Sequence, residues 1–307
     1  MADSTELSIV VVSWNVRELL RACLAALPRD AEVIVVDNAS SDGSATMVAA
    51  EFPTVRLVAN QDNRGFTGGN NQGLALAQGR TILLLNPDTI VQDNALEILV
   101  NFLDSHPETG VVGPQLRYAD GSLQSSRRRF PTLATALLES TPLAWHWPPE
   151  RNRWAQRYHM ADRSADVEQE VDWLVGAALL TRREVLEQVG GFDEGYFMYS
   201  EELDWQRRVK AAGWKIVYVP QAVITHYEGK SSEQVTAARH IRFNTSKVRY
   251  FRKHHGAIQA QLLRLALLAM FAIEWIIEAA KYALGSRRAL RTERMQAYGQ
   301  LLRTGLR

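Results

Sequence analysis

Residues 7–37 read LSIVVVSWNVRELLRACLAALPRDAEVIVVD, and this stretch decides the fold class. Leu7–Ser13 and Glu32–Asp37 are almost continuously apolar, which is typical of strands covered on both faces of a sheet. Between them, the apolar residues of Val16–Leu27 recur at helical spacing. A strand, a helix and a second strand joined by short links predict a βαβ unit with parallel strands.

The same alternation of strands and helices continues toward Val112. Three further helices are predicted at Ser44–Phe52, Gly69–Ala77 and Asp93–Leu103, and three strands at Val55–Ala59, at Thr81–Asn86 and around Val111. We therefore expect an α/β fold with a Rossmann-like, mostly parallel central sheet flanked by helices. In such sheets ligands bind beyond the carboxyl ends of the strands, so the loops after Val36 and Leu85 should carry the site.

The middle of the chain follows a different pattern. Asp120–Asp172 is polar with little periodicity, and we expect a long excursion over the sheet that is part loop and part helix. Regular elements then resume, with strands predicted at Trp173–Leu180 and Ile216–Val219 and helices at Arg183–Val189 and Glu201–Ala212.

Composition excludes several classes of protein. The 307 residues are 46% hydrophobic, carry a net charge of +1 and contain one cysteine, Cys23. This excludes a disordered chain, a disulfide scaffold and a cysteine-based zinc site, and it argues against a general nucleic-acid binder. Cys23 lies in a helical pattern, so we expect it to be buried. Acidic residues precede the first apolar run, which predicts a strand rather than a signal peptide, and a cytoplasmic location.

Carboxylates stand where two predicted strands end. Asp37 closes an apolar strand, so a ligand contact is favoured over a structural role. Asp42, five residues later, fits a ligand contact and a helix cap equally well. Pro87 stops another strand and presents Asp88, which can bind Mg²⁺ or Mn²⁺ together with diphosphate oxygens; an Asp-containing turn is the alternative. Asn60–Gly73, rich in glycine and asparagine before a helix, could meet a phosphate or form a tight turn.

The densest acidic cluster is Glu201, Glu202 and Asp204 at the start of a predicted helix. Such charges repel one another unless a cation is near, the helix N-terminus stabilises them, or a pKa is raised. Aromatic residues precede the cluster and would desolvate it, so one carboxylate is a candidate general base. His226 follows a later strand, and we expect a structural role for it unless it reaches Asp88.

Several of these motifs together resemble a known family. In order they are IVVVSWN, VIVVDNASSDGS, NRGFTGGNNQG, LLLNPD, the long segment from WLVGAALL to VKAAGW, and VITHYEG. The chain resembles the inverting glycosyltransferases of family two, which have a GT-A fold, and in particular their bacterial rhamnosyltransferase-like members. The resemblance covers residue 7 to about residue 230, and the ordered series is more specific than any single motif.

The resemblance implies an activity. Such an enzyme moves a sugar, rhamnose or a similar one, from a dTDP- or UDP-sugar to a hydroxyl of a lipid-linked or cell-surface glycan. It does so in a single displacement, with Mg²⁺ or Mn²⁺ stabilising the leaving diphosphate.

It also implies the site residues. The nucleotide pocket would include Ser13, Asn15, Asp37, Asn38 and Asp42, with Asp37 on the nucleobase. The diphosphate and sugar site would include Asn63, Gly65, Phe66, Asn70, Asn86 and Asp88. The metal would be held by Asp88 and His226. The acceptor site would include Trp173, Gly176 and Asp193. Glu202 would deprotonate the acceptor hydroxyl, with Glu201 and Asp204 beside it.

Two positions depart from the family pattern. Asn86 stands where the family usually has the first aspartate of its metal motif, and the loss of that charge should weaken metal affinity. Glu201–Glu202 stands where the family usually has Glu-Asp, and the longer side chain places the base differently. Glu201 therefore remains an alternative base.

The C-terminal part of the chain is basic and apolar. His240–His255 contains no acidic residue, and the tail after Gly285 has six arginines against one acid, Glu293. The wholly apolar core between them, Leu265–Ile273, would be about 13 Å long as a helix, too short to cross a bilayer. We expect an amphipathic helix on a membrane surface or in an oligomer interface; a helical hairpin packed on the catalytic domain is the alternative. Arg127 and Arg128, in the loop SSRRRF, could bind an acceptor diphosphate or simply be solvated.

The sequence thus predicts a catalytic domain at residues 1–238 and a membrane-associating or oligomerising region at 239–307. The protein would work in the cytoplasm at the inner face of the cell membrane, on a nucleotide sugar and a lipid-linked acceptor. A sugar nucleotidyltransferase is one alternative, although SWNVREL is not the Gly-rich phosphate loop that it needs. A nonenzymatic nucleotide-sugar or glycan-binding module is another, although Asp88, Glu202 and Asp204 argue against it.

Overall fold

The computed structural model describes residues 6–139, 152–227 and 236–307. By their contacts these residues form two compact units. Described residues of the first unit are 6–130, 159–197 and 201–227. Those of the second unit are 131–139, 152–158, 198–200 and 236–307. The predicted site residues all fall in the first unit.

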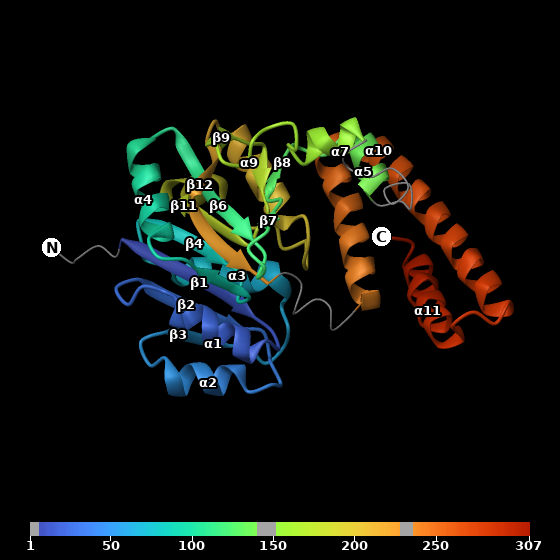
Figure 1. Cartoon of the computed structure of the whole chain (residues 1–307), viewed down its shortest axis with the longest axis horizontal. Coiled ribbons are helices and arrows are strands. Elements are labelled where there is room, and N and C mark those ends of the chain that lie inside the picture. Colours follow the sequence, from blue (N-terminus) through green and yellow to red (C-terminus); the bar gives the residue numbers. More distant parts are fainter. Residues whose placement is uncertain (1–5, 140–151, 228–235) are drawn as a thin grey trace. The chain divides into compact units, whose positions relative to one another are not determined.

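A ten-stranded sheet forms the centre of the first unit (Figure 1). Its strands are β1 (Leu7–Ser13), β2 (Glu32–Asp37), β3 (Arg56–Ala59), β4 (Thr81–Leu85), β5 (Thr89–Val91), β6 (Thr109–Arg117), β7 (Leu123–Gln124), β9 (Gln169–Glu170), β11 (Ala178–Arg182) and β12 (Lys215–His226). The main order is β3-β2-β1-β4-β11-β6-β12-β5. The first four of these are mutually parallel, and β11 runs antiparallel to both β4 and β6.

Helices cover both faces of this sheet. They are α1 (Arg17–Ala25), α2 (Ser44–Glu51), α3 (Gly65–Leu76), α4 (Ala95–Ser105), α8 (Arg183–Val189) and α9 (Glu201–Ala211). Alternate residues of each strand point to opposite faces: Ile9 and Val11 join the core under α1, α2 and α4, whereas Val10 and Val12 join the core that includes α8 and α9. Burial on both sides explains why these strands are almost continuously apolar.

The structure confirms the predicted elements of the first hundred residues with small shifts at their ends and differs more beyond them. The strand expected at Trp173–Leu180 is interrupted: β10 (Trp173–Leu174) pairs with β8 (Arg127–Arg128) in a second sheet, and β11 comes after it. Strand β12 is much longer than expected, because a register shift between Val219 and Val223 accommodates Pro220 without ending the strand. It therefore carries His226 at its end.

The second unit is helical. Its helices are α5 (Leu133–Glu139), α7 (Arg153–Tyr158), α10 (Thr236–Ala283) and α11 (Arg288–Thr304). Gly256, with φ 88° and ψ 168°, interrupts α10, so residues 257–283 form a helix of their own. This helix packs along α11 through buried apolar side chains such as Leu263 and Leu267, and the two form a hairpin. Part of the expected middle segment, residues 140–151, lies outside the described residues.

One ion-pair cluster joins the two helices of this hairpin. The buried Glu278 carboxylate pairs with Arg291 at 2.7 Å, with Lys281 at 3.4 Å and with Arg294 at 3.5 Å. The apolar part of α10 is longer than Leu265–Ile273, the apolar core identified in the sequence. One helix of the described chain, within Ala238–Ala283, is long and apolar enough to span a membrane, with 22% of its 18-residue window buried. The expectation counted only the nine residues Leu265–Ile273, and it was wrong about the length of the apolar helix that contains them.

Candidate active site

The parallel half of the sheet brings the predicted strand-end residues together at one edge. Ser13 and Asp37 are register partners at the ends of β1 and β2, and β4 ends beside β1 just before Asn86. This is the edge at which parallel α/β sheets bind ligands.

Two polar atoms at this edge are buried without a hydrogen-bond partner among the described residues. Asp37 is 2% exposed; its Oδ1 accepts the Ser40 N–H at 2.9 Å, whereas Oδ2 has no partner. The hydroxyl of the neighbouring Ser13 is also buried without a hydrogen-bond partner among the described residues. Buried polar groups are nearly always paired. We therefore expect the carboxylate oxygen to accept a hydrogen bond from a ligand, and the hydroxyl to accept one from a ligand or donate one to it.

Asn15 and Asn38 shape the loops around these atoms. Asn15 adopts a left-handed conformation, with φ 52°, and its side chain accepts the Ser41 N–H at 2.7 Å. Asn38 donates to the Gly65 carbonyl at 2.8 Å, which ties the end of β2 to the start of α3. Both asparagines hold backbone in place through internal contacts.

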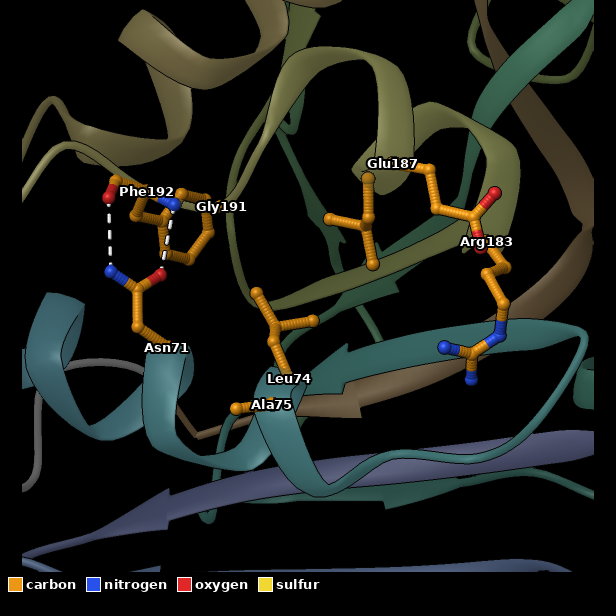
Figure 2. Close-up of a pocket in the computed structure, with 8 residues that line it drawn as sticks. Asn71, Leu74, Ala75, Arg183, Glu187, Gly191 and Phe192 are labelled. Carbon is orange, nitrogen blue, oxygen red and sulfur yellow. Dashed lines mark hydrogen bonds between the residues drawn. The ribbon is translucent and has the colours of Figure 1, made fainter.

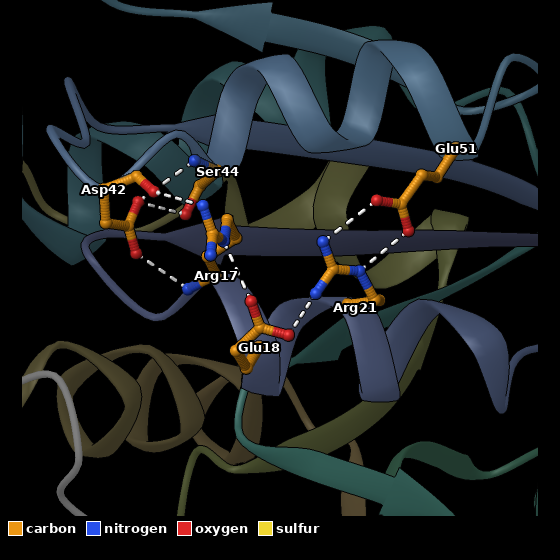
Figure 3. Close-up of polar contacts among 6 residues, drawn as sticks. All are labelled: Arg17, Glu18, Arg21, Asp42, Ser44 and Glu51. Atoms are coloured by element: carbon orange, nitrogen blue, oxygen red, sulfur yellow. Dashed lines mark hydrogen bonds and ion pairs between the residues drawn. The ribbon is translucent and has the colours of Figure 1, made fainter.

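Asp42 lies one residue before Gly43, the N-cap of α2, and its carboxylate holds the first residues of α1 and α2. Figure 3 shows one carboxylate oxygen accepting the Arg17 N–H at 2.8 Å and the other accepting the Ser44 N–H and hydroxyl at 3.0 and 2.6 Å. Burial opposes ionisation, but the hydrogen bonds from Ser44 and from the Arg17 backbone outweigh it and lower the pKa of Asp42. On the same surface, Arg21 of α1 binds Glu51 of α2 through both carboxylate oxygens, which fixes the two helices.

The N-terminus of α3 is a turn held by internal hydrogen bonds: the Phe66 and Thr67 N–H groups both donate to the Phe197 carbonyl, at 2.9 and 3.5 Å. Asn63 accepts the Gly65 N–H at 2.9 Å, and Asn70 donates back to the Phe66 carbonyl one helical turn earlier. Gly65 has φ +75°, and a Cβ there would lie 2.4 Å from the Phe197 carbonyl oxygen, so only glycine fits. The hydroxyl of Thr67, a residue that the sequence did not predict in the site, is buried without a partner among the described residues.

Asp88 and His226, 138 residues apart in the chain, meet at the end of the sheet. His226 Nε2 lies 3.3 Å from Asp88 Oδ1, and both side chains are at least 93% buried. The condition that gave His226 a functional role, that it reaches Asp88, is thus met. The pairing of β12 with β5 produces this contact, because His226 is the register partner of Thr89, which is next to Asp88 in the chain.

This pair fits one divalent cation. Ligand atoms about 2.1 Å from an octahedral ion are about 3 Å apart, close to the separation of Nε2 and Oδ1. Gln124 Oε1 lies 3.0 Å from His226 Nδ1, so it can accept the Nδ1–H and leave the lone pair on Nε2, which lies 3.4 Å from Asn86 Nδ2 and can bind a metal. The Asn86 Oδ1 beside them is buried without a partner in the described part of the chain. Among the described residues, no three His, Cys, Asp or Glu side chains lie close enough together to hold a metal ion. A ligand or water would therefore complete the coordination shell.

Glu201 and Glu202 are the first two residues of α9; the Glu201 side chain is buried and Glu202 is half-buried. Burial, reinforced by the neighbouring Glu202 charge, raises the pKa of Glu201 well above its usual value. Burial also raises the pKa of Glu202, although backbone hydrogen bonds, including one from Gly176, and the charge of Arg128 act against it. Each carboxyl has one Oε2 atom without a partner among the described residues. Two of the explanations that the sequence offered for this acidic cluster thus act together: burial raises the pKa of both glutamates, and backbone hydrogen bonds at the start of α9 stabilise their ionised form.

Contacts at residues 176–177 link Glu202 to the strand end that carries Asp88. A Cβ at Gly176 would lie 3.2 Å from the Cβ and Cγ of Glu202, so Gly176 lets the strand pack directly on this side chain. The next residue, Ala177, accepts the Asn86 N–H at 2.9 Å. The strand end that carries Asp88 and the helix that carries Glu202 thus meet across residues 176–177.

The remaining predicted residues make internal contacts. Asp204 is fully buried and pairs with Arg208 at 3.0 Å. Arg127 is buried, donates to the Ser164 carbonyl at 2.7 Å and stacks over Tyr218, and burial lowers its pKa. Trp173 donates to the Arg129 carbonyl, and Asp193 accepts the Gly195 N–H. These contacts position the walls of the site, whereas Arg128 acts on Glu202 through its charge.

Comparisons with known proteins agree with this geometry. A family model described as "Glycosyltransferase like family 2" matches residues 5–243. N-acetylglucosaminyl-diphospho-decaprenol L-rhamnosyltransferase of Mycobacterium tuberculosis (strain H37Rv) is 30% identical over 282 residues, which is 87% of this chain and 91% of the relative. Rhamnosyltransferase WbbL of Escherichia coli K12 is 26% identical over 71% of this chain and 82% of its own.

The fold is shared with solved structures. The mannosyltransferase PcManGT from Pyrobaculum calidifontis, solved with GDP-Man and Mn²⁺, superposes with a TM-score of 0.56 at 20% identity, covering 98% of this chain and 84% of the other. At this level of identity the likeness establishes the fold alone.

Proposed function

We propose, since the chain belongs to glycosyltransferase family 2, that it transfers rhamnose or a similar sugar from a dTDP- or UDP-sugar to a hydroxyl of a lipid-linked glycan. The observation that carries this proposal is the meeting of Asp88 with His226 at the sheet edge that also bears the buried carboxyls of α9. The name of the mycobacterial relative, which specifies a rhamnosyl transfer to a diphospho-decaprenol, supports the choice of sugar and acceptor.

Asp88 and His226 would hold Mg²⁺ or Mn²⁺. When bound, the cation neutralises the charge that develops on the leaving diphosphate. Gln124 would hold the His226 ring so that Nε2 faces Asp88. Asp37 Oδ2 and the Ser13 hydroxyl, with no partner in the described chain, would bind the nucleobase and ribose end of the donor.

Glu202 is the better placed of the two candidate bases. It is partly exposed, whereas Glu201 is 3% exposed, and a base must touch the incoming hydroxyl. A protonated Glu201 would leave Glu202 as the single negative charge of the pair. In the reaction the acceptor oxygen bonds to the anomeric carbon, its proton passes to Glu202, and the bond from that carbon to the diphosphate oxygen breaks. One such displacement inverts the anomeric configuration, as in inverting glycoside hydrolysis.

The helical hairpin of α10 and α11 would hold the protein on the membrane where a lipid-linked acceptor lies. The outward face of residues 257–283 carries exposed Ile258, Leu265, Ile273, Trp275 and Ile276. Exposed arginines lie on the neighbouring turn and on α11, among them Arg287, Arg288 and Arg303. An apolar face beside a basic one suits the surface of an anionic bilayer, and for a cytoplasmic enzyme this is the inner face of the cell membrane. The alternative is that a second copy of the chain covers the same apolar face.

The test is an in vitro transfer reaction. Purified chain with Mg²⁺ or Mn²⁺, dTDP-rhamnose and N-acetylglucosaminyl-diphospho-polyprenol should yield a disaccharide lipid with inverted anomeric configuration, detected by mass spectrometry and NMR. UDP-glucose and UDP-galactose serve as competing donors. Release of diphosphate from a nucleoside triphosphate and a sugar phosphate would instead identify the nucleotidyltransferase alternative. Binding of every donor without turnover on any acceptor or on water would indicate a binding module.

A further inference from the structure

Asn71 of α3 makes a two-way contact with the chain segment that precedes α9. Its Nδ2 donates to the Phe192 carbonyl at 3.0 Å, and its Oδ1 accepts the Phe192 N–H at 2.9 Å. Figure 2 shows the amide reaching from α3 to this segment, with both bonds on one residue. A side-chain amide thus pairs with backbone across 121 residues of sequence, as a strand would.

The same segment is fastened to α9 from its other side. The Trp205 Nε1–H donates to the Gly190 carbonyl at 3.0 Å, and the Arg208 guanidinium donates to the Val189 and Gly191 carbonyls at 2.7 Å each. The fully buried Asp204 holds that guanidinium in place at 3.0 Å. Trp205 and Phe192 also meet edge to face, with ring centroids 5.7 Å apart. Residues 189–192 therefore form a bridge between α3 and α9.

The bridge is in close contact with the Asn71 amide, and a pocket lies next to this contact. A Cβ at Gly191 would lie 2.6 Å from Asn71 Oδ1, so the glycine is needed for the amide to approach. Next to this contact a pocket of about 380 Å³ opens between α3 and α8, lined by Leu74, Ala75, Arg183 and Leu186 among others. Beside this pocket, α3 is connected to the bridge by the hydrogen bonds of Asn71 and by the stacking of Phe66 on Phe192, with ring centroids 6.5 Å apart.

In the proposed function, α3 would contribute to the donor site and α9 would carry the catalytic base. The N-terminus of α3 would face the donor diphosphate, one helical turn and a half before Asn71, and α9 begins with Glu201 and Glu202. A second contact, from the Phe66 N–H to the Phe197 carbonyl at 2.9 Å, ties the same two regions nearer the donor. The relative position of donor and base therefore depends on the bridge.

We propose that Asn71 is a positioning residue for sugar transfer: by pairing with Phe192 it fixes the α9 carboxylates relative to the donor bound at α3. This rests on the proposed function. Asn71 would touch neither substrate, so its loss should lower turnover much more than donor affinity. A misplacement of about 1 Å between reacting groups can cost about 100-fold in rate.

The test compares Asn71→Leu, which removes both hydrogen bonds to Phe192 and a third to Glu194 at similar volume, with Asn101→Leu, the same change on the exposed face of α4. We measure hydrogen exchange of peptides covering residues 186–200, donor affinity by calorimetry with dTDP-rhamnose, and transfer kinetics. For Asn71→Leu we expect exchange in this segment at least about tenfold faster, a kcat at least about tenfold lower, and donor affinity within about threefold of the parent. Asn101→Leu should match the parent in all three.

Gly191→Ala gives an independent perturbation, because its Cβ would displace the Asn71 amide from the opposite side. It should reproduce the Asn71→Leu pattern, and with Asn71→Ser it carries the test if Asn71→Leu does not fold. Unchanged exchange in residues 186–200, or a donor affinity that falls as much as kcat, would overturn the proposal. If the sugar donor has been misidentified, dTDP-rhamnose will not bind the parent chain while the exchange result still stands, so the two failures are distinguishable.

Discussion

At the scale of single residues, the two glutamates of α9 have separable roles. Glu202 is partly exposed and would receive the acceptor proton, so Glu202→Gln should lower kcat by about 10²–10⁴-fold. Donor affinity should survive, because the glutamine has the same shape and the donor does not need this charge. Steady-state kinetics together with calorimetry measure both quantities. Near-parental turnover of Glu202→Gln, with a large loss in Glu201→Gln, would move the base to Glu201.

Glu201 also sets a pH dependence of stability. Burial, with the Glu202 charge second, raises its pKa, so the folded chain binds this proton more tightly than the unfolded chain does. Its contribution to the free energy of unfolding is present below the usual glutamate pKa and is lost as pH rises. Glu201→Gln, which cannot ionise, should therefore raise Tm by about 2 °C or more near pH 8 and by less near pH 5. Thermal unfolding across this range measures the difference; a gain that grows toward acid pH would contradict it.

Gln124 is the residue through which the metal pair can be tested without removing a ligand. Its Oε1 holds His226 Nδ1 at 3.0 Å, and loss of such a partner typically weakens metal affinity about 10–100-fold. Gln124→Ala should raise the Mn²⁺ concentration needed for half-maximal activity by this factor, while Asp88→Ala abolishes the metal response. Gln92→Ala, which removes a hydrogen bond to Thr225, the neighbour of His226 in β12, but no contact with the His226 ring, is the control. Activity that persists in a chelator would remove the metal from the reaction.

At the scale of elements, the sequence predicted those features that depend on local pattern. Apolar runs identified β1, β2 and β4, and the strand ends identified Asp37 and Asp88, because both signals lie within a few residues of each other. The contact of His226 with Asp88 could only be stated as a condition, since it depends on β12 continuing past Pro220 and pairing with β5. No local signal distinguishes a strand that ends at a proline from one that bulges around it.

Residues that act through distant partners were missed for the same reason. Gln124 lies on a two-residue strand and reaches His226 across 102 positions, and Asn71 reaches Phe192 across 121. Neither side chain belongs to a type or spacing that indicates a site by itself. Asp204 illustrates the converse: its place in an acidic cluster suggested catalysis, whereas its contact with Arg208 indicates that it orients the bridge to α9.

At the scale of the whole molecule, the net charge of +1 is the sum of two unlike regions. The described first unit places carboxylates at a sheet edge, where in the proposed function a cation and a proton would be bound. The second unit ends in the hairpin of α10 and α11. Its buried Glu278 forms an ion pair with Arg291, whereas Arg287, Arg288 and Arg303 are exposed. Neutrality excluded a general nucleic-acid binder, but it concealed a basic surface of the kind that anionic lipid attracts.

The membrane proposal can be tested on the full chain by single charges. Ile276 is 61% exposed on the hairpin and Val167 is 58% exposed on the first unit, so Ile276→Asp and Val167→Asp are matched changes. Placing a carboxylate in a bilayer interface opposes binding, and each exposed arginine near an anionic surface contributes about 1 kcal/mol. Flotation with vesicles of phosphatidylglycerol and phosphatidylcholine should therefore recover less Ile276→Asp and less Arg287→Glu/Arg288→Glu, but unchanged Val167→Asp. Recovery of the parent should fall with added salt, because charge attraction to the surface is screened.

Equal recovery of all four proteins, together with a concentration-dependent dimer that Ile276→Asp dissociates, would instead assign the apolar face to a second copy of the chain.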